Sequence, residues 1–192
     1  MENLQDRLIA AERIINEPSF LKNKGLGNEV GYYIFTYPAE DELIVRAWIG
    51  AMQDKYAVGS GRFQIVVFDL YDIMVDILTE KGFLDKCFEF EQKKGLDRLT
   101  KAVGNTLRIT SEDGLILNYI RDRAPEHSVL FLTGIGKCYP LLRSHTVLNN
   151  LHQVIDNVPV VMFYPGKYDG QELVLFNEIK DDNYYRAFRL VD

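Results

Sequence analysis

Cysteine and histidine are scarce in this chain of 192 residues, which has two of the first and three of the second. Cys87 and Cys138 lie far apart with no Cys-x-x-Cys spacing, so they could form one disulfide at most, and a chain of this size does not need it. His145 and His152 are seven residues apart, roughly 10 Å along a helix and too far to share one metal ion. The sequence therefore predicts neither a disulfide scaffold nor histidine-based chemistry.

Long apolar runs are also missing. The longest, such as residues 158–164, fall far short of the about 20 residues that a membrane-spanning helix needs. The first residues are acidic and amphipathic rather than basic and then apolar, so we expect no signal peptide. The expected location is accordingly the cytoplasm.

The composition is that of an ordinary globular protein, with 47% hydrophobic and 26% charged residues. A net charge of −6 argues against a protein whose whole surface wraps nucleic acid. The length suits one domain with its own core, and the sequence contains neither an internal repeat nor a convincing linker. We therefore expect residues 1–192 to form a single domain.

Apolar and aromatic runs alternate with segments of helical periodicity. Strands are predicted at residues 32–37, 64–68, 129–133, 160–164 and 173–176, with a short edge strand in the C-terminal tail. Helices are predicted at residues 2–16, 40–56, 73–78, 83–107 with a break near Gly95, 111–123 and 141–155. Strands separated by helices favour parallel pairing through right-handed crossovers. The prediction is an α/β fold, a three-layer sandwich. Its central sheet is mixed and mostly parallel, with about five strands and a C-terminal hairpin, and the helical segment near residues 83–125 lies on one side.

The segment after the predicted third strand has the composition of a degenerate phosphate-binding loop. It contains Gly134, Gly136 and Lys137. Open α/β sheets bind ligands at this end of their strands. A nucleotide-triphosphate loop, Gly-x-x-x-x-Gly-Lys-Ser/Thr, would have glycine at Phe131 and a magnesium-binding hydroxyl at Cys138. Asp69, which ends the second strand, resembles the acidic magnesium partner of such a site but precedes the loop. A strand-to-helix turn that needs only glycines also explains the segment, so we expect a nucleotide-binding-like scaffold without a working loop and with no cofactor.

A second arrangement of charged residues lies in the predicted C-terminal hairpin. Restriction-type nucleases hold a metal ion with an Asp and a Glu-x-Lys pair on neighbouring strands, and the lysine orients or activates the attacking water. Asp169, Glu178 and Lys180 follow that order, but they act together only if the register brings the two carboxylates close. An Asp before Gly is also an ordinary turn residue. A metal-dependent nuclease is therefore an alternative function.

Positive charge concentrates in the central helical region of this acidic chain. The residues are Lys86, Lys93, Lys94, Arg98, Lys101 and Arg108. Lys94, Arg98 and Lys101 are spaced to share one helical face. Such a patch fits nucleic acid or an acidic partner, although it is more often the solvated side of a helix. A nucleic-acid-binding subunit is a further alternative.

The C-terminal tail has the residue types that anchor protein interfaces, namely tyrosine and arginine. It contains Asp181, Asp182, Asn183, Tyr184, Tyr185 and Arg186, followed by Phe188 and Arg189. An edge strand whose aromatic side chains close the core would use the same residues. Residues 181–186 are our predicted partner-binding segment.

The C-terminal third resembles the BrxB family, small proteins of bacterial BREX bacteriophage-defence systems. The resemblance rests on residues 163–170, 173–176 and 180–188, and residues 134–145 resemble the central segment of that family. It implies a core BREX component encoded beside an ATPase, an adenine methyltransferase and the alkaline-phosphatase-like protein PglZ. It also implies a structural role with PglZ as the direct partner and with the methyltransferase and the ATPase as alternative partners. It assigns no catalytic residue. The expectation is a non-enzymatic adaptor.

Overall fold

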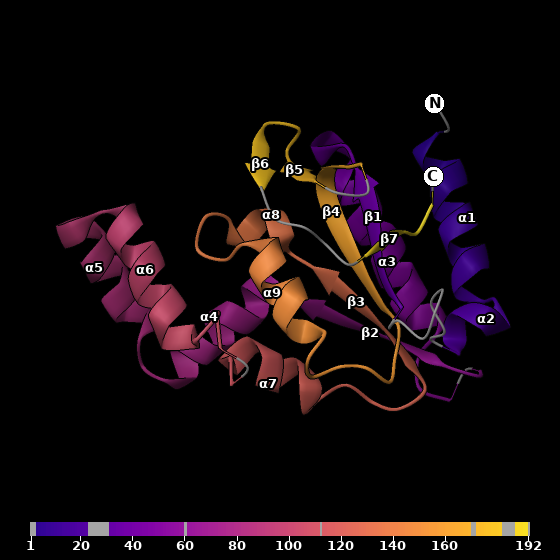
Figure 1. Ribbon diagram of the computed structural model, residues 1–192, viewed down its shortest axis with the longest axis horizontal. Helices are drawn as coiled ribbons and strands as arrows, with labels where there is room; N and C mark the ends of the chain where they lie inside the picture. The colour runs from indigo at the N-terminus through magenta and orange to yellow at the C-terminus, as the bar shows by residue number, and fades with distance from the viewer. Residues whose placement is uncertain are drawn as a thin grey trace. The chain divides into compact units, whose positions relative to one another are not determined.

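The computed structural model describes residues 3–22, 31–59, 61–111, 113–169, 172–181 and 187–191 (Figure 1). The chain forms two compact units. Unit 1 consists of Met1–Phe68, Ala124–Thr133 and Asp156–Asp192, and unit 2 consists of Asp69–Arg123 and Gly134–Ile155. The expectation that residues 1–192 form a single domain stays a prediction.

Unit 1 contains a mostly parallel sheet whose described strands follow the order β2-β3-β4-β1-β7. These strands are β1 (Tyr32–Tyr37), β2 (Gln64–Asp69), β3 (Ser128–Thr133), β4 (Val160–Tyr168) and β7 (Phe188–Arg189). Parallel register pairs Tyr32 of β1 and Leu130 of β3 with the same residue, Val160 of β4. The α/β class, the central sheet of about five strands and the edge strand in the tail are thereby confirmed.

Two short strands extend the long strand β4 into a hairpin. β5 (Leu173–Leu175) pairs antiparallel with β4, and β6 (Ile179–Asp181) pairs antiparallel with β5. The predicted returning strand is therefore present but one residue shorter, and β6 was not predicted.

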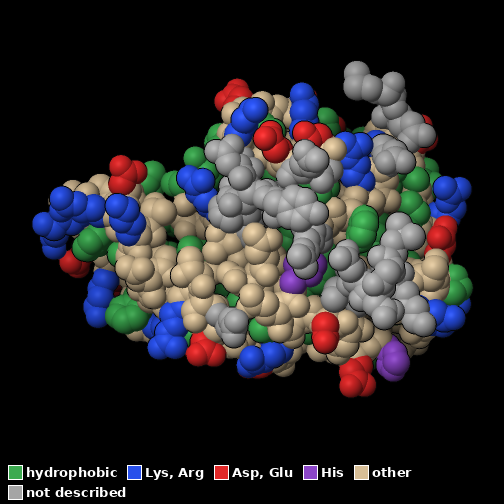
Figure 2. Space-filling view, viewed as in Figure 1, with side chains coloured by type: hydrophobic (Ala, Val, Ile, Leu, Met, Phe, Trp, Pro, Cys, Tyr) green, Lys and Arg blue, Asp and Glu red, His purple; other side chains and the backbone are tan. Residues whose placement is uncertain are grey.

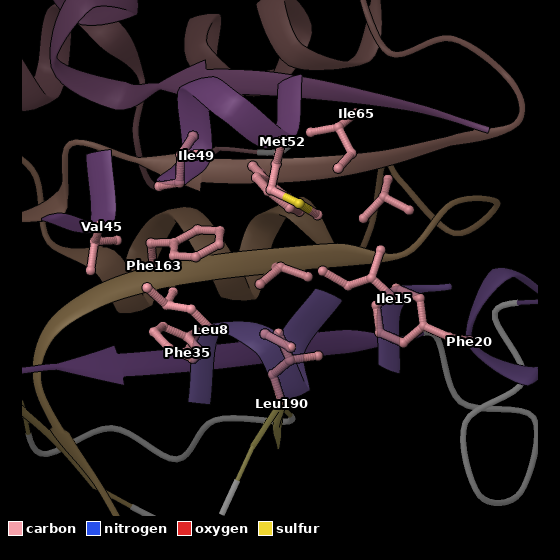
Figure 3. Close-up of a cluster of buried hydrophobic side chains, with 14 of the residues drawn as sticks. Leu8, Ile15, Phe20, Phe35, Val45, Ile49, Met52, Ile65, Phe163 and Leu190 are labelled. Carbon is pink, nitrogen blue, oxygen red and sulfur yellow. The ribbon is translucent and has the colours of Figure 1, made fainter. Parts of the chain in front are cut away.

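Helices of unit 1 cover one face of its sheet and enclose a hydrophobic core (Figure 3). They are α1 (Leu4–Ile15), α2 (Pro18–Leu21) and α3 (Glu42–Lys55), with the 3-10 turn η1 (Ala39–Asp41) before α3. Phe163 of β4 packs its ring against Phe131 and Phe35, with ring centroids 4.9 and 5.7 Å apart. The single tryptophan, Trp48, lies against Phe131 and Phe163. This aromatic group ties α3 to three neighbouring strands.

Unit 2 is helical. It contains α4 (Leu70–Glu80), α5 (Leu84–Lys94), α6 (Leu96–Leu107), α7 (Leu115–Arg121), α8 (Ile135–Cys138) and α9 (Ser144–Leu151). α4 contacts α5, α7 and α8, while α7 contacts α9. Gly95 separates α5 from α6 with φ +81°, a left-handed value that glycine adopts without strain, so the predicted break is confirmed. α9 is shorter than the predicted helix at 141–155.

Candidate functional site

Asp69 links the end of β2 to the start of α4. The apolar run before it favours a strand, and its short carboxylate suits a helix N-cap. Asp69 Oδ1 accepts hydrogen bonds from the backbone N–H of Tyr71 at 3.0 Å and of Asp72 at 3.2 Å. The carboxylate thus satisfies two N–H groups that lack partners within the helix.

Lys137 reaches this carboxylate from the short helix α8. Its Nζ lies 2.6 Å from Asp69 Oδ2 and 3.3 Å from Asp72 Oδ1. The same ammonium lies 5.3 Å from the centre of the Tyr71 ring. We call Asp69, Tyr71, Asp72 and Lys137 the strand-end cluster, because it forms where β2 and β3 end. All four residues belong to unit 2.

Gly134 allows the turn after β3 to pass close to Asp69. Its φ is +77°, and an added Cβ would lie 2.3 Å from Asp69 Oδ1. Both features exclude a larger side chain. β3 ends at Thr133 and α8 begins at Ile135, so the turn is a single residue, and Gly136 lies inside α8. Gly134, Gly136 and Lys137 therefore lie at the predicted strand end. Gly134 forms a tight turn, and Gly136 and Lys137 belong to the short helix α8 that follows it.

The electrostatics of the cluster keep Lys137 charged. Burial alone would lower the pKa of this lysine, but its hydrogen bond to Asp69 and the charges of Asp69 and Asp72 together raise it. The neighbouring Cys138 is buried, and burial raises the pKa of its thiol to about 12. Cys138 is accordingly a neutral thiol at physiological pH, and neither a nucleophile nor a ligand for a hard cation.

The two predicted nuclease carboxylates lie in separate turns of the hairpin, and Lys180 lies in β6. Asp169 Oδ1 accepts a hydrogen bond from Glu172 N at 2.8 Å in the turn between β4 and β5. Glu178 lies in the turn at the other end of β5, where its N–H donates to Leu175 O. Lys180 Nζ lies 3.7 Å from Glu172 Oε2. The register thus places Asp169 and Glu178 at opposite ends of β5.

No group of three His, Cys, Asp or Glu side chains in the described parts of the chain could hold a metal ion. None of the described helices is both long and apolar enough to cross a membrane.

The basic residues of the central region divide between two helices. Lys86, Lys93 and Lys94 belong to α5, and Arg98 and Lys101 belong to α6. Because the chain turns at Gly95, Lys94 does not share a helical face with Arg98, and that part of the prediction is wrong. The predicted tail segment falls almost wholly outside the described residues. Of its six residues, the structure describes only the backbone of Asp181, paired with Leu173.

Sequence reasoning missed Tyr71 and Asp72 as members of the strand-end cluster. The available signal was the spacing of Asp72, three residues after an aspartate that ends a strand, since this is a helix-capping pattern. The pairing with Lys137 joins residues 65 positions apart and has no local signal.

Comparison with known proteins decides the family. The model of the family described as BREX protein BrxB matches residues 66–190. The chain belongs to the BrxB family. A BREX protein BrxB from Bacillus cereus (strain H3081.97) is 52% identical over 192 residues, covering 100% of both chains. A BREX protein BrxB from Escherichia coli O9:H4 (strain HS) is 36% identical over 190 residues, covering 98% of this chain and 92% of the relative. No solved structure matches the chain. The resemblance inferred from the sequence is confirmed, and membership of the BrxB family implies a role in BREX phage defence.

Proposed function

We propose that this chain is a non-enzymatic adaptor of a BREX complex, acting through protein–protein contacts with PglZ as its direct partner. Membership of the BrxB family supports the setting in phage defence. The observation that carries the non-enzymatic part is the ion pair at the strand end. Lys137, which matches the phosphate-binding lysine of a nucleotide site, lies 2.6 Å from Asp69 Oδ2.

The charge arrangement of the strand-end cluster argues against phosphate binding. A phosphate-binding lysine has to meet its anion, whereas Lys137 is already held by Asp69 and Asp72. A phosphate beside these two carboxylates would meet like charges at short range. The single-residue turn at Gly134 also lacks the run of backbone N–H groups that surrounds a phosphate.

The hairpin gives the nuclease alternative little support. Asp169 and Glu178 serve separate turns, and Lys180 lies beside Glu172. We expect the purified chain to leave duplex and single-stranded DNA intact with Mg²⁺ or Mn²⁺. Cleavage that disappears in Asp169→Ala and Glu178→Ala variants would overturn the non-enzymatic proposal.

Reconstitution with purified PglZ tests the adaptor role. We expect the two proteins to elute together and to form a complex of defined mass by light scattering. If they elute separately at micromolar concentration, while the chain itself is folded, PglZ is not its direct partner.

The tail supplies the predicted contact residues. We expect Tyr184→Ala, Tyr185→Ala and Arg186→Ala each to weaken PglZ binding about tenfold or more, because tyrosine and arginine dominate interface energies. Isothermal titration calorimetry on variants of normal helicity measures this. Leu43→Ala, which truncates an exposed residue of α3, is the matched control. Unchanged affinity in all three tail variants would remove the tail from the interface.

A further inference from the structure

Helix α5 buries very little of its own surface. It contacts α4 and α6, yet none of its residues is fully buried, and only Leu84 and Cys87 are partly covered. Phe88 is 56% exposed and Phe90 is 38% exposed. Phe83, at the N-cap, is also exposed. Such a concentration of uncovered aromatic rings on one helix is unusual for an isolated soluble protein.

The exposed rings lie on either side of the two partly covered residues of α5, Leu84 and Cys87. Phe83 and Phe90 are two helical turns apart, and they flank Leu84 and Cys87 on one side. Phe88 lies one turn after Leu84 and flanks them on the other side. Unit 2 therefore partly covers Leu84 and Cys87 and leaves the rings on both sides of them in water.

A basic stripe lies on the adjoining helix. Arg98, Lys101 and Arg108 are spaced by three and seven residues, which puts them along one side of α6 and its C-cap. All three are exposed, and none forms a salt bridge with a described residue. Figure 2 shows Lys and Arg side chains gathered over α5 and α6.

The charge of this region is opposite to that of the chain. Residues 81–108 carry seven Lys and Arg against four Asp and Glu, while the whole chain has a net charge of −6. The surface is thus complementary to an acidic partner. On α5, Asp85, Glu89 and Glu91 balance Lys86, Lys93 and Lys94, so its exposed rings lie on a helix of zero net charge rather than in the positively charged groove that follows a nucleic-acid backbone. An acidic protein surface fits this mixture better than nucleic acid.

We propose that the α5–α6 hairpin docks an acidic protein surface that presents its own apolar side chains. Phe88 and Phe90 become buried in the contact, and Arg98 and Lys101 pair with carboxylates of the partner. This inference rests on the adaptor role proposed above and assigns the α5–α6 hairpin to it as a second contact segment, in addition to the tail.

Charge reversal and aromatic removal on the hairpin test the inference. The variants are Arg98→Glu/Lys101→Glu and Phe88→Ser/Phe90→Ser, all at exposed positions. The matched controls in unit 1 are Arg13→Glu/Lys22→Glu and Ile9→Ser/Leu43→Ser, which change exposed residues of the same kinds. Far-UV circular dichroism and thermal melting establish that each variant folds. Binding to purified PglZ is then measured by calorimetry at low and high salt.

We expect each hairpin variant to bind at least tenfold more weakly than the wild type, while the controls bind normally. We also expect the salt dependence to be reduced in Arg98→Glu/Lys101→Glu, because its two cations contribute to it. If the wild type binds PglZ and the hairpin variants bind equally well, this inference is wrong and the adaptor role stands. If the wild type binds no PglZ, both are wrong.

The wild type and the four variants are also titrated with duplex and single-stranded DNA. We expect weak binding that is the same for the hairpin variants and the controls. Tight, salt-sensitive DNA binding that is lost only in Arg98→Glu/Lys101→Glu would assign the basic stripe to nucleic acid and overturn the proposal.

Discussion

At the scale of single residues, the strand-end cluster depends on one glycine. Gly134 combines a left-handed φ of +77° with a backbone that passes directly beside the Asp69 carboxylate. That carboxylate caps α4 and also holds Lys137, so displacing it disturbs a helix start and an ion pair together. Glycine is required here by space as well as by conformation.

Gly134→Ala is therefore expected to lower the free energy of unfolding by roughly 2–4 kcal/mol, because backbone strain adds to the loss of both Asp69 contacts. Gly82→Ala is the matched control in unit 2. Gly82 has φ +66°, but an added Cβ would meet nothing within 4 Å, so only the strain of about 1 kcal/mol remains. Urea denaturation measures both. Equal losses in the two variants would contradict the close approach.

The ion pairs of Lys137 make the free energy of unfolding of the chain depend on pH. Its pKa is raised in the folded chain above the ordinary value of 10.5, so its stabilising effect is complete below pH 10.5 and is lost as pH rises through the folded-state pKa. Lys137→Met is expected to destabilise the chain by about 1 kcal/mol at pH 7, and this difference should shrink above pH 10.5.

The control for this variant is Lys93→Met, which breaks the exposed pair with Glu89 and should change stability by less than about 0.5 kcal/mol. Urea denaturation between pH 7 and 11 compares the two. A Lys137→Met deficit that persists unchanged at high pH would show that lost packing, rather than charge, causes it.

At the scale of elements, β4 holds the sheet together. It pairs with β1 on one side and β3 on the other, and its end pairs with β5. All but one of its residues are buried. Phe163 contacts Trp48 of α3 and also packs against the rings of Phe35 on β1 and Phe131 on β3.

Phe163→Ala is expected to cost about 3–5 kcal/mol of unfolding free energy, because it leaves a cavity among rings that cannot close over it. Phe176→Ala, in the exposed turn between β5 and β6, should cost less than about 1 kcal/mol. Thermal and urea denaturation of both variants provide the test. A small loss in Phe163→Ala would mean that the aromatic group repacks.

Helices and strands could be predicted from the sequence wherever neighbouring residues alone determine the backbone conformation. Continuous apolar runs predicted β2, β3 and the start of β4, and Gly95 predicted the boundary between α5 and α6. Register could not be predicted, because it depends on which short strand pairs with which. β5, a strand of three residues, carries little pattern of its own. The separation of Asp169 from Glu178, in contrast, follows from the sequence, because the two residues flank that strand.

At the scale of the whole molecule, the chain passes between its two units four times. Unit 2 is made of two insertions, one after β2 and one after β3, and each returns to a strand of unit 1. The ion pair between Asp69 and Lys137 joins these two insertions. Neither unit can therefore be isolated by removing one end of the chain.

This connectivity predicts one cooperative unfolding transition, because loss of the sheet releases the anchored ends of both insertions. Trp48 lies in unit 1 and is the only tryptophan, so its fluorescence reports that unit. Far-UV circular dichroism reports the helices of both units. We expect coincident midpoints in urea. Two separated midpoints would contradict the single-domain expectation.

The function could be inferred from the sequence only through the resemblance of whole segments. Gly134, Gly136 and Lys137, taken alone, suggested a degenerate phosphate loop. The actual partners of Lys137 became apparent only when the fold brought it to Asp69 and Asp72. The exposure of Phe88 could not be predicted either. Phe88 follows Leu84 by four residues, and this spacing is typical of side chains that face a core.

The position of β4 in the sheet has a consequence for synthesis of the protein. β4 leaves the ribosome after β1, β2 and β3, yet it is the neighbour of both β1 and β3. Until residue 160 emerges, β1 has no partner among the described strands, and one edge of β3 is open. Nascent chains and fragments that stop before β4 therefore present unpaired apolar strands, and we expect chaperones and proteases to bind them.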